Sequence, residues 1–227
     1  MEIPHKKYLN DYLTGKWPGS PARGELYNDD PRLGDARLCG TTASLCGVQS
    51  ALASGDAAAL TQALTLDIAL HALMFTLSGV PVLYSGDEIA QMNDDAYHDD
   101  PLKAGDSRYL HRGDMDWSAA EKRRDATTPE GRIFGAIKRL EALRAEHAAF
   151  SADAEVRLLP MGDDSLLGIE RKCDGERLLA LFNFSEWPKP ARLEGGGSLT
   201  DLWTGSPVRV DGLTVPAGGF MWLLDNL

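Results

Sequence analysis

The stretch "GVPVLYSGDEIAQMNDD" at residues 79–95 decides which fold the sequence predicts. It begins with a short apolar run at residues 80–84 and then changes abruptly to carboxylates and amides. The run is too short for a helix and rich in β-branched residues, so it predicts a buried strand. Polar groups just past the carboxyl end of a strand are typical of the functional edge of parallel α/β folds and barrels. Asp and Asn also commonly cap a turn after a strand, and the spacing leaves both interpretations open.

Two predicted helices flank this strand. Apolar residues recur at helical spacing over residues 57–77, Asp56 is placed to cap the first turn, and Gly79 ends the helix. A second helix near residues 130–147 begins after Thr128, which can act as its cap. A strand between two such helices is the repeating unit of an α/β fold.

The chain before residue 57 is less regular. A short helix is expected at residues 4–13. Turn-forming residues then dominate residues 15–41, which predicts a long irregular loop. Loops of this length inside compact domains are often functional.

The hydrophobic period changes after residue 151. "SLLGIERKC" and "ERLLALFNF" read as two strands joined by Asp174-Gly175, the two-residue turn that best matches strand twist. "SLTDLW", "PVRV", "LTV" and "GFMWLL" predict further short strands, with Asp211-Gly212 as a second tight turn. We therefore expect two domains, an α/β domain at 1–150 and a small all-β domain at 151–227.

Composition and charge exclude several classes of function. The 227 residues carry 34 acidic and 23 basic side chains, a net charge of −11 that disfavours nucleic acid and anionic membranes as partners. Residues 68–86 approach the length of a membrane span, but Gly79 and Pro81 favour a helix followed by a strand. The three cysteines are odd in number and lack metal-ligand spacing. We expect buried thiols, a cytoplasmic protein, and no cofactor.

Several separated motifs resemble one enzyme family. "GVPVLYSGDE" resembles the last barrel-strand motif of the α-amylase superfamily, glycoside hydrolase family 13. "NDD…DSRYLHRGDMDW", "GDARLCGTTASL", "LFNFSEWP" and the closing "GFMWLL" are similar to the amylosucrase and sucrose hydrolase branch of that family. The similarity runs over nearly the whole chain, with the motifs in the same order.

This resemblance implies the C-terminal fragment of a (β/α)₈ barrel followed by an antiparallel β-sandwich. The helix at 57–77, the strand at 80–84 and the helix at 130–147 would be the seventh helix, the eighth strand and the closing helix. Residues before 57 would form an insertion that covers the pocket mouth, and residues 151–227 would form the sandwich.

The resemblance also implies an activity. Family members hydrolyse or transfer glucosyl units with retention, using a carboxylate nucleophile and a carboxylic acid/base. In this numbering both groups, and a third Asp, would precede Met1. We therefore expect no catalytic residue here, an isolated chain that is inactive, and two partners: a sucrose or α-glucan substrate and the missing N-terminal barrel portion.

The letters of "YHDD" at residues 97–100 match the family's His-Asp-Asp motif, but the context does not. In the family that motif ends an apolar strand, whereas here it follows "NDDA" in a polar segment. A solvated acidic loop is the preferred interpretation. Calcium binding by the same aspartates is the alternative, although the spacing fits no EF-hand loop and Pro101 interrupts it.

Three residues are candidate substrate contacts by resemblance. Arg112 in "HRGDMDW" matches the Arg of the Arg-x-Pro-Met-x-Trp motif of related α-glucosidases, although Gly113-Asp114 departs from that pattern. Arg37 in "GDARLCGT" matches an arginine that amylosucrases direct at the pocket, and Asp35 would accept a sugar hydroxyl. A guanidinium can hold a carboxylate and a hydroxyl together. The alternative for each is a structural ion pair.

A second hypothesis is a non-catalytic carbohydrate-binding or assembly module acting through the β domain. The tryptophans Trp187, Trp203 and Trp222 are expected to fill the core of that domain and its contact with the barrel, with a sugar-stacking platform as the alternative. We expect Asp87 and Glu88 to brace the chain by accepting hydrogen bonds from backbone N–H groups.

Overall fold

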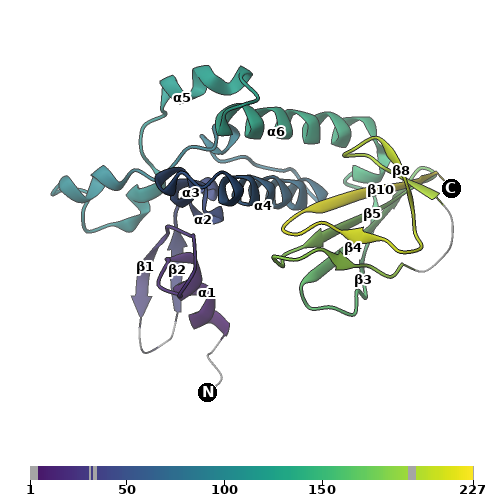
Figure 1. Ribbon diagram of the computed structural model, residues 1–227, viewed down its shortest axis with the longest axis horizontal. Coiled ribbons are helices and arrows are strands. Elements are labelled where there is room, and N and C mark those ends of the chain that lie inside the picture. The colour runs from purple at the N-terminus through teal and green to yellow at the C-terminus, as the bar shows by residue number, and fades with distance from the viewer. Residues whose placement is uncertain (1–4, 31, 33–34, 194–197, 227) are drawn as a thin grey trace. The chain divides into compact units, whose positions relative to one another are not determined.

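The computed structural model describes residues 5–30, 32, 35–193 and 198–226, without the side chains of Asp35 and Asn226. The chain divides into two compact units (Figure 1). Unit 1 comprises Met1–Asp67 and Leu83–Gly135, and unit 2 comprises Ile68–Val82 and Ala136–Leu227. The expected domains at 1–150 and 151–227 stay a prediction.

Unit 1 contains mostly short elements. They are α1 (His5–Leu13), β1 (Glu25–Asp30), β2 (Asp35–Cys39), α2 (Thr42–Cys46), α3 (Val48–Ser54), the 3₁₀ helices η1 (Asp87–Ile89), η2 (Asp95–Asp99), η3 (Ser107–His111) and η4 (Lys122–Arg124), and α5 (Trp117–Glu121). Two longer helices, α4 (Ala57–Thr76) and α6 (Pro129–Glu146), contribute residues to both units.

The predicted long loop after α1 is wrong over part of its length, because β1 and β2 pair there as an antiparallel hairpin. Its strands are polar and lack the apolar alternation by which strands are recognised. Side chains from neighbouring segments hold it instead. The Arg108 guanidinium lies 4.5 Å from the centre of the Tyr27 ring, and the Tyr97 hydroxyl donates to the Glu25 carboxylate.

Both long helices occur where the sequence predicts them. Asp56 Oδ1 accepts the backbone N–H groups of Ala58 and Ala59 at 2.9 and 3.0 Å, which confirms the cap of α4. Thr128 Oγ1 accepts the N–H of Gly131 at 3.1 Å at the start of α6. By length and composition alone α4 could cross a membrane, a test that the core helix of a soluble protein also passes.

The predicted buried strand at residues 80–84 does not form, and this prediction is wrong. Val80 and Val82 are 87% and 77% exposed, and the segment has no regular secondary structure. A strand needs a neighbour to accept and donate its backbone hydrogen bonds. None of the strand pairings in the described part of the chain includes this segment. An apolar run in the sequence therefore does not become a strand here.

Unit 2 is built on one antiparallel sheet of order β3-β4-β5-β10-β7-β8 (Figure 1). Its strands are β3 (Glu155–Leu159), β4 (Leu166–Cys173), β5 (Glu176–Asn183), β7 (Ser198–Asp201), β8 (Ser206–Arg209) and β10 (Phe220–Asn226). The predicted turn between β4 and β5 is confirmed: Asp174 and Gly175 have φ of 46° and 83°. Two positive φ values are the signature of the type I′ hairpin.

Both faces of the central strand β5 are covered. On one face Leu179, Leu181 and Leu223 pack with Val215, which belongs to a small sheet formed by β6 (Lys189–Pro190) and β9 (Thr214–Val215), and with Ala191 and Leu213 next to that sheet. On the other face the ring of Trp222 is fully buried, lies 4.6 Å from that of Phe150, and donates through Nε1 to Thr76 Oγ1 at 2.9 Å. The larger sheet with the smaller one against it forms a sandwich.

The tryptophans of unit 2 differ in their burial. Trp222 fills the core as predicted. Trp203 is half-buried, between the Phe220 ring and the guanidinium of Arg139. The prediction that Trp187 fills the core is wrong, because its side chain is 72% exposed.

Two arginines close the C-terminal end of α4. The guanidinium of Arg171, fully buried on β4, donates to the carbonyl oxygens of Thr76, Ala149 and Ser151 at 2.7–2.9 Å. Arg144 donates to the carbonyl oxygen of Phe75. Both positive charges therefore lie at the negative end of the helix dipole and satisfy carbonyl groups that would otherwise lack a partner.

Candidate functional site

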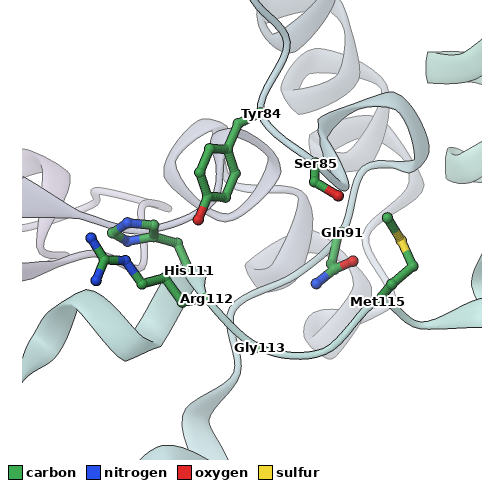
Figure 2. A pocket seen from close by; sticks show the side chains of 7 residues that line it. All are labelled: Tyr84, Ser85, Gln91, His111, Arg112, Gly113 and Met115. Atoms are coloured by element: carbon green, nitrogen blue, oxygen red, sulfur yellow. The ribbon is translucent and has the colours of Figure 1, made fainter.

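A pocket of about 320 Å³ opens in unit 1 (Figure 2). Its volume lies within the range of small-molecule sites. Its walls come from the chain around η1 and from the segment that follows η3, and its lining residues are Tyr84, Ser85, Gln91, His111, Arg112, Gly113 and Met115. Tyr84 is 50% exposed, so the pocket is open to solvent.

The wall around η1 depends on a tight turn at Gly86. This residue has φ of +101°, and a Cβ added there would lie 2.8 Å from Gln91 Oε1. Glu88 Oε2 accepts the N–H of Gly86 at 2.8 Å, which confirms that Glu88 braces the turn. The same role for Asp87 stays a prediction. The "SGDE" motif therefore builds a pocket wall by combining a glycine turn with a carboxylate that closes it.

Asn93 joins three parts of unit 1. Its Oδ1 accepts the N–H of Thr41 at 2.8 Å, and its Nδ2 donates to the carbonyl oxygen of Arg23. Its own backbone N–H donates to Oγ of the fully buried Ser44 at 3.0 Å. The amide at the end of the opening motif therefore holds the backbone in place.

His111 connects η3 to the end of β2. Its Nδ1 accepts the N–H of Gly40 at 3.3 Å. Burial lowers the pKa of His111, and the positive charge of Arg112 lowers it further, while the carboxylates of Asp106 and Asp87 act in the opposite direction. Because Nδ1 is occupied as an acceptor, the neutral ring carries its proton on Nε2. Above its pKa, His111 is therefore a neutral hydrogen-bond donor in the pocket wall.

Arg112 presents an exposed cation at the pocket (Figure 2). Its guanidinium makes no hydrogen bond or ion pair with any residue that the structure describes. The nearby Asp106 does not neutralise it, because Arg108 Nη2 already lies 2.6 Å from Asp106 Oδ2. Hydrogen bonds from Arg108 lower the pKa of Asp106 to about 2. Arg112 therefore remains available to an incoming acceptor group.

The other two predicted contacts do not line this pocket. Arg37 is exposed on β2, opposite Tyr27 in the hairpin register. The backbone of Asp35 pairs with Asp30 at the start of β2, but its side chain lies outside the described part of the chain. Gly40 links β2 to the pocket, because it follows β2 directly and its N–H donates a hydrogen bond to His111.

Of the seven lining residues the sequence predicts only Arg112 as a site residue, and three of the others, Tyr84, Gln91 and His111, make side-chain contacts of their own. His111 stands next to Arg112 in the "HRGDMDW" motif, and this adjacency was the one available signal. The sequence places Tyr84 at the end of the predicted strand at residues 80–84, yet its ring meets that of His111 edge to face, with centroids 5.8 Å apart. Gln91 donates through Nε2 to the carbonyl oxygen of Asp114 at 3.2 Å.

The acidic segment near η2 serves local structure. Asp94 accepts the N–H of Ala96 at 3.1 Å, and Asp100 accepts that of Leu102 at 2.9 Å. His98 is exposed, and its Nε2 lies 2.8 Å from Glu25 Oε1. Among the described residues, no group of three or more His, Cys, Asp or Glu side chains is arranged to hold a metal ion.

Comparison with known proteins gives a consistent set of structures, whereas no family model matches the sequence. An AmyP variant in complex with maltotriose aligns with a TM-score of 0.59 at 17% identity, over 81% of this chain and 38% of that chain. The trehalulose synthase MutB from Pseudomonas mesoacidophila MX-45 aligns with a TM-score of 0.54 at 16% identity, over 71% and 38%. An Anoxybacillus α-amylase aligns with a TM-score of 0.52 at 20% identity, over 78% and 35%.

The similarity covers most of this chain but little more than a third of each of these enzymes. At these identities it establishes the fold, and the antiparallel sandwich of unit 2 agrees with it. The chain thus shares its fold with the C-terminal part of these enzymes, including the β-sandwich, and at the level of the fold this agrees with the resemblance carried by its motifs.

Proposed function

We propose that this chain is the C-terminal part of a retaining α-glucosyl hydrolase or transferase that acts on sucrose or an α-glucan, of the amylosucrase or sucrose hydrolase type. The observation that carries the proposal is Arg112, an arginine without a partner among the described residues, at the mouth of a pocket built from the family motifs. A solved MutB variant holds its substrate sucrose, and a solved AmyP variant holds maltotriose, which supports a sugar as the ligand class.

The lining side chains suit a sugar but cannot cleave one. Arg112 can hold a carboxylate and a hydroxyl at once through its planar fork. Ser85 and Gln91 offer a hydroxyl and an amide to further sugar hydroxyls. Retaining catalysis needs two carboxyl groups about 5 Å apart, and the lining contains no Asp or Glu. In the proposed enzyme these carboxylates belong to the N-terminal barrel portion, and Arg37 and Asp35 contact the substrate from the hairpin.

One measurement on the isolated chain and one reading of the upstream coding sequence test the first part of this proposal. Incubated with sucrose or maltotriose, the chain should release no glucose or fructose above the uncatalysed background. Turnover by the chain alone would contradict the assignment of the carboxylates to another segment. The coding sequence immediately upstream should encode, in frame, a strand ending in His-Asp-Asp and the two earlier carboxylate motifs. An upstream region without them would overturn the proposal.

The role of Arg112 is tested in the polypeptide that includes the upstream segment. Arg112→Lys keeps the charge but loses the fork, and we expect kcat/KM on sucrose or maltotriose to fall about 100-fold, the scale of a misplaced substrate contact. The matched control is Arg124→Lys on η4, where the side chain is exposed and makes no hydrogen bond or ion pair with another described residue. Equal activities of the two variants would remove Arg112 from the substrate site.

A second function rests on Trp187. The carbonyl oxygen of this exposed residue accepts hydrogen bonds from Asn183 Nδ2 at 2.8 Å and Ser185 Oγ at 2.7 Å, so its backbone is firmly held. An exposed indole on a firmly held backbone is a suitable stacking surface for a sugar ring. If unit 2 is a carbohydrate-binding module, calorimetry of the isolated chain with maltotriose will give saturable heat that Trp187→Ala abolishes. Under the first proposal the isolated chain gives no saturable heat.

A further inference from the structure

The two arginines assigned to the substrate lie on different segments of unit 1. Arg37 belongs to β2, and Arg112 follows η3. The ring of His111 spans these segments, because it precedes Arg112 in the chain and its Nδ1 accepts the N–H of Gly40, the residue that follows β2. We propose that His111 is a positioning residue whose neutral ring holds the end of β2 against Arg112, and that protonation of this ring releases the connection.

The geometry allows only the neutral ring to make this bond. A protonated imidazole carries hydrogens on both nitrogens, so its Nδ1–H would face the Gly40 N–H, donor against donor. Gly40 is closely packed, because a Cβ at its position would lie 2.9 Å from Leu45 Cδ2. We therefore expect the ring of His111, rather than Gly40, to move. Arg112 is the next residue and moves with it.

The surroundings of the ring set the pH at which this happens. Burial and the Arg112 cation favour the neutral form, whereas Asp106 on η3 and Asp87 on η1 favour the protonated form. The edge of the Tyr84 ring packs against the imidazole with an interplanar angle of 70°. The net effect is a lowered pKa, so the connection is intact at neutral pH and opens only in acid.

A titration of the whole chain by NMR tests this without any sugar. We expect the imidazole nitrogens of His111 to show the Nε2–H tautomer at neutral pH, with a midpoint below the ordinary 6.5. The amide of Gly40 and the Nε–H of Arg112 should shift with that same midpoint. A Gly40 amide that ignores the titration of His111, or a ring protonated on Nδ1 at neutral pH, would overturn the inference.

Two variants separate positioning from simple packing. His111→Asn keeps an acceptor near the position of Nδ1, so the Gly40 amide should stay at its neutral-pH position and lose its pH dependence. His111→Gln places its amide nearer to Nε2, so the Gly40 amide should lie at its acid position at every pH. Identical Gly40 shifts in both variants would contradict the inference, and if either fails to fold the wild-type titration still decides.

This inference rests on the proposed function only for its consequence, the placement of two sugar-binding arginines. A coupled titration with no sugar-dependent activity in the longer polypeptide would leave the His111 connection standing and remove the proposed function. An active enzyme whose Gly40 amide does not follow the titration of His111 would leave the proposed function standing and remove the His111 connection.

Discussion

The interior of unit 2 and the interior of unit 1 are stabilised by different kinds of interaction. In unit 2 the strand β5 carries a continuous run of buried apolar side chains at residues 178–182, which cover both faces of the sheet. In unit 1 the chain around the pocket is held by single polar contacts such as those of Asn93, Glu88 and His111. The stabilisation from apolar burial is spread over many residues, whereas the stabilisation from such a polar contact depends on one side chain. Single substitutions should therefore act locally in unit 1, and in unit 2 only its few buried charges should be comparably sensitive.

The largest effect is expected at Arg171 in unit 2. Arg171→Met removes the donors to three carbonyl oxygens and leaves those acceptors buried, which should lower the free energy of unfolding by about 3–5 kcal/mol. Urea denaturation followed by circular dichroism measures this. Arg209→Met on β8 is the matched control, since its side chain is exposed, and it should change stability little. Equal urea midpoints for the two variants would show that the protein tolerates loss of the hydrogen bonds donated by Arg171.

A pH titration addresses the second buried charge of β4, the carboxylate of Glu170. Burial acts to raise its pKa, but hydrogen bonds from Arg157 and Arg177 lower it to about 2, against an ordinary value of 4.5. The unfolded chain therefore binds the proton first, and the stabilisation present above pH 4.5 is lost as pH falls toward 2. The loss should amount to about 3 kcal/mol at most.

The measurement is the free energy of unfolding between pH 6 and the acid limit, for the wild type and for Glu170→Gln. The variant should be less stable at neutral pH and should show a flatter pH profile. Glu155→Gln, an exposed carboxylate on β3, should retain the wild-type slope. If Glu170→Gln keeps the full slope, the acid sensitivity of the protein resides in other carboxylates.

The smallest of the three effects is expected at Asn93 in unit 1. Asn93→Ala leaves the N–H of Thr41 and the carbonyl oxygen of Arg23 without their partner, at a cost of about 2 kcal/mol. Hydrogen exchange should accelerate at Thr41 while the amides of β5 stay protected. Asn93→Asp keeps the acceptor for the N–H of Thr41, so its exchange rate at Thr41 should lie between those of the wild type and Asn93→Ala. Faster exchange throughout β5 would show that the hydrogen bonds of Asn93 also support the sheet. It would contradict the expectation that substitutions in unit 1 act locally.

The elements predicted correctly are those whose signal is local. The helices α4 and α6 follow from apolar spacing and an adjacent cap, and the β4–β5 hairpin follows from Asp174-Gly175. The predicted strand at residues 80–84 failed because a strand is a property of a pair, and the described chain provides no partner for it. The hairpin β1–β2 was missed for the converse reason, since its polar strands are held by residues about 70 to 80 positions away.

The residues of the candidate site also separate into those that the sequence predicted and those that only the folded structure identified. Arg112 was predicted through its motif and lines the pocket, whereas Arg37 lies on the neighbouring strand and Asp35 has no described side chain. Tyr84 and His111 stand within quoted motifs but were not singled out as site residues, and Gln91 carried no motif signal. Their roles follow from contacts with residues brought near by folding.

The amino-acid sequence by itself determined the helices α4 and α6 and the β4–β5 hairpin with its Asp174-Gly175 turn, because each depends on side chains a few residues apart. Only the tertiary structure decided that His111 meets Gly40, that Asn93 joins Thr41 to Arg23, and that residues 80–84 remain unpaired. Backbone periodicity is a short-range property, but a hydrogen bond between two segments depends on where each of them is placed by everything else that packs.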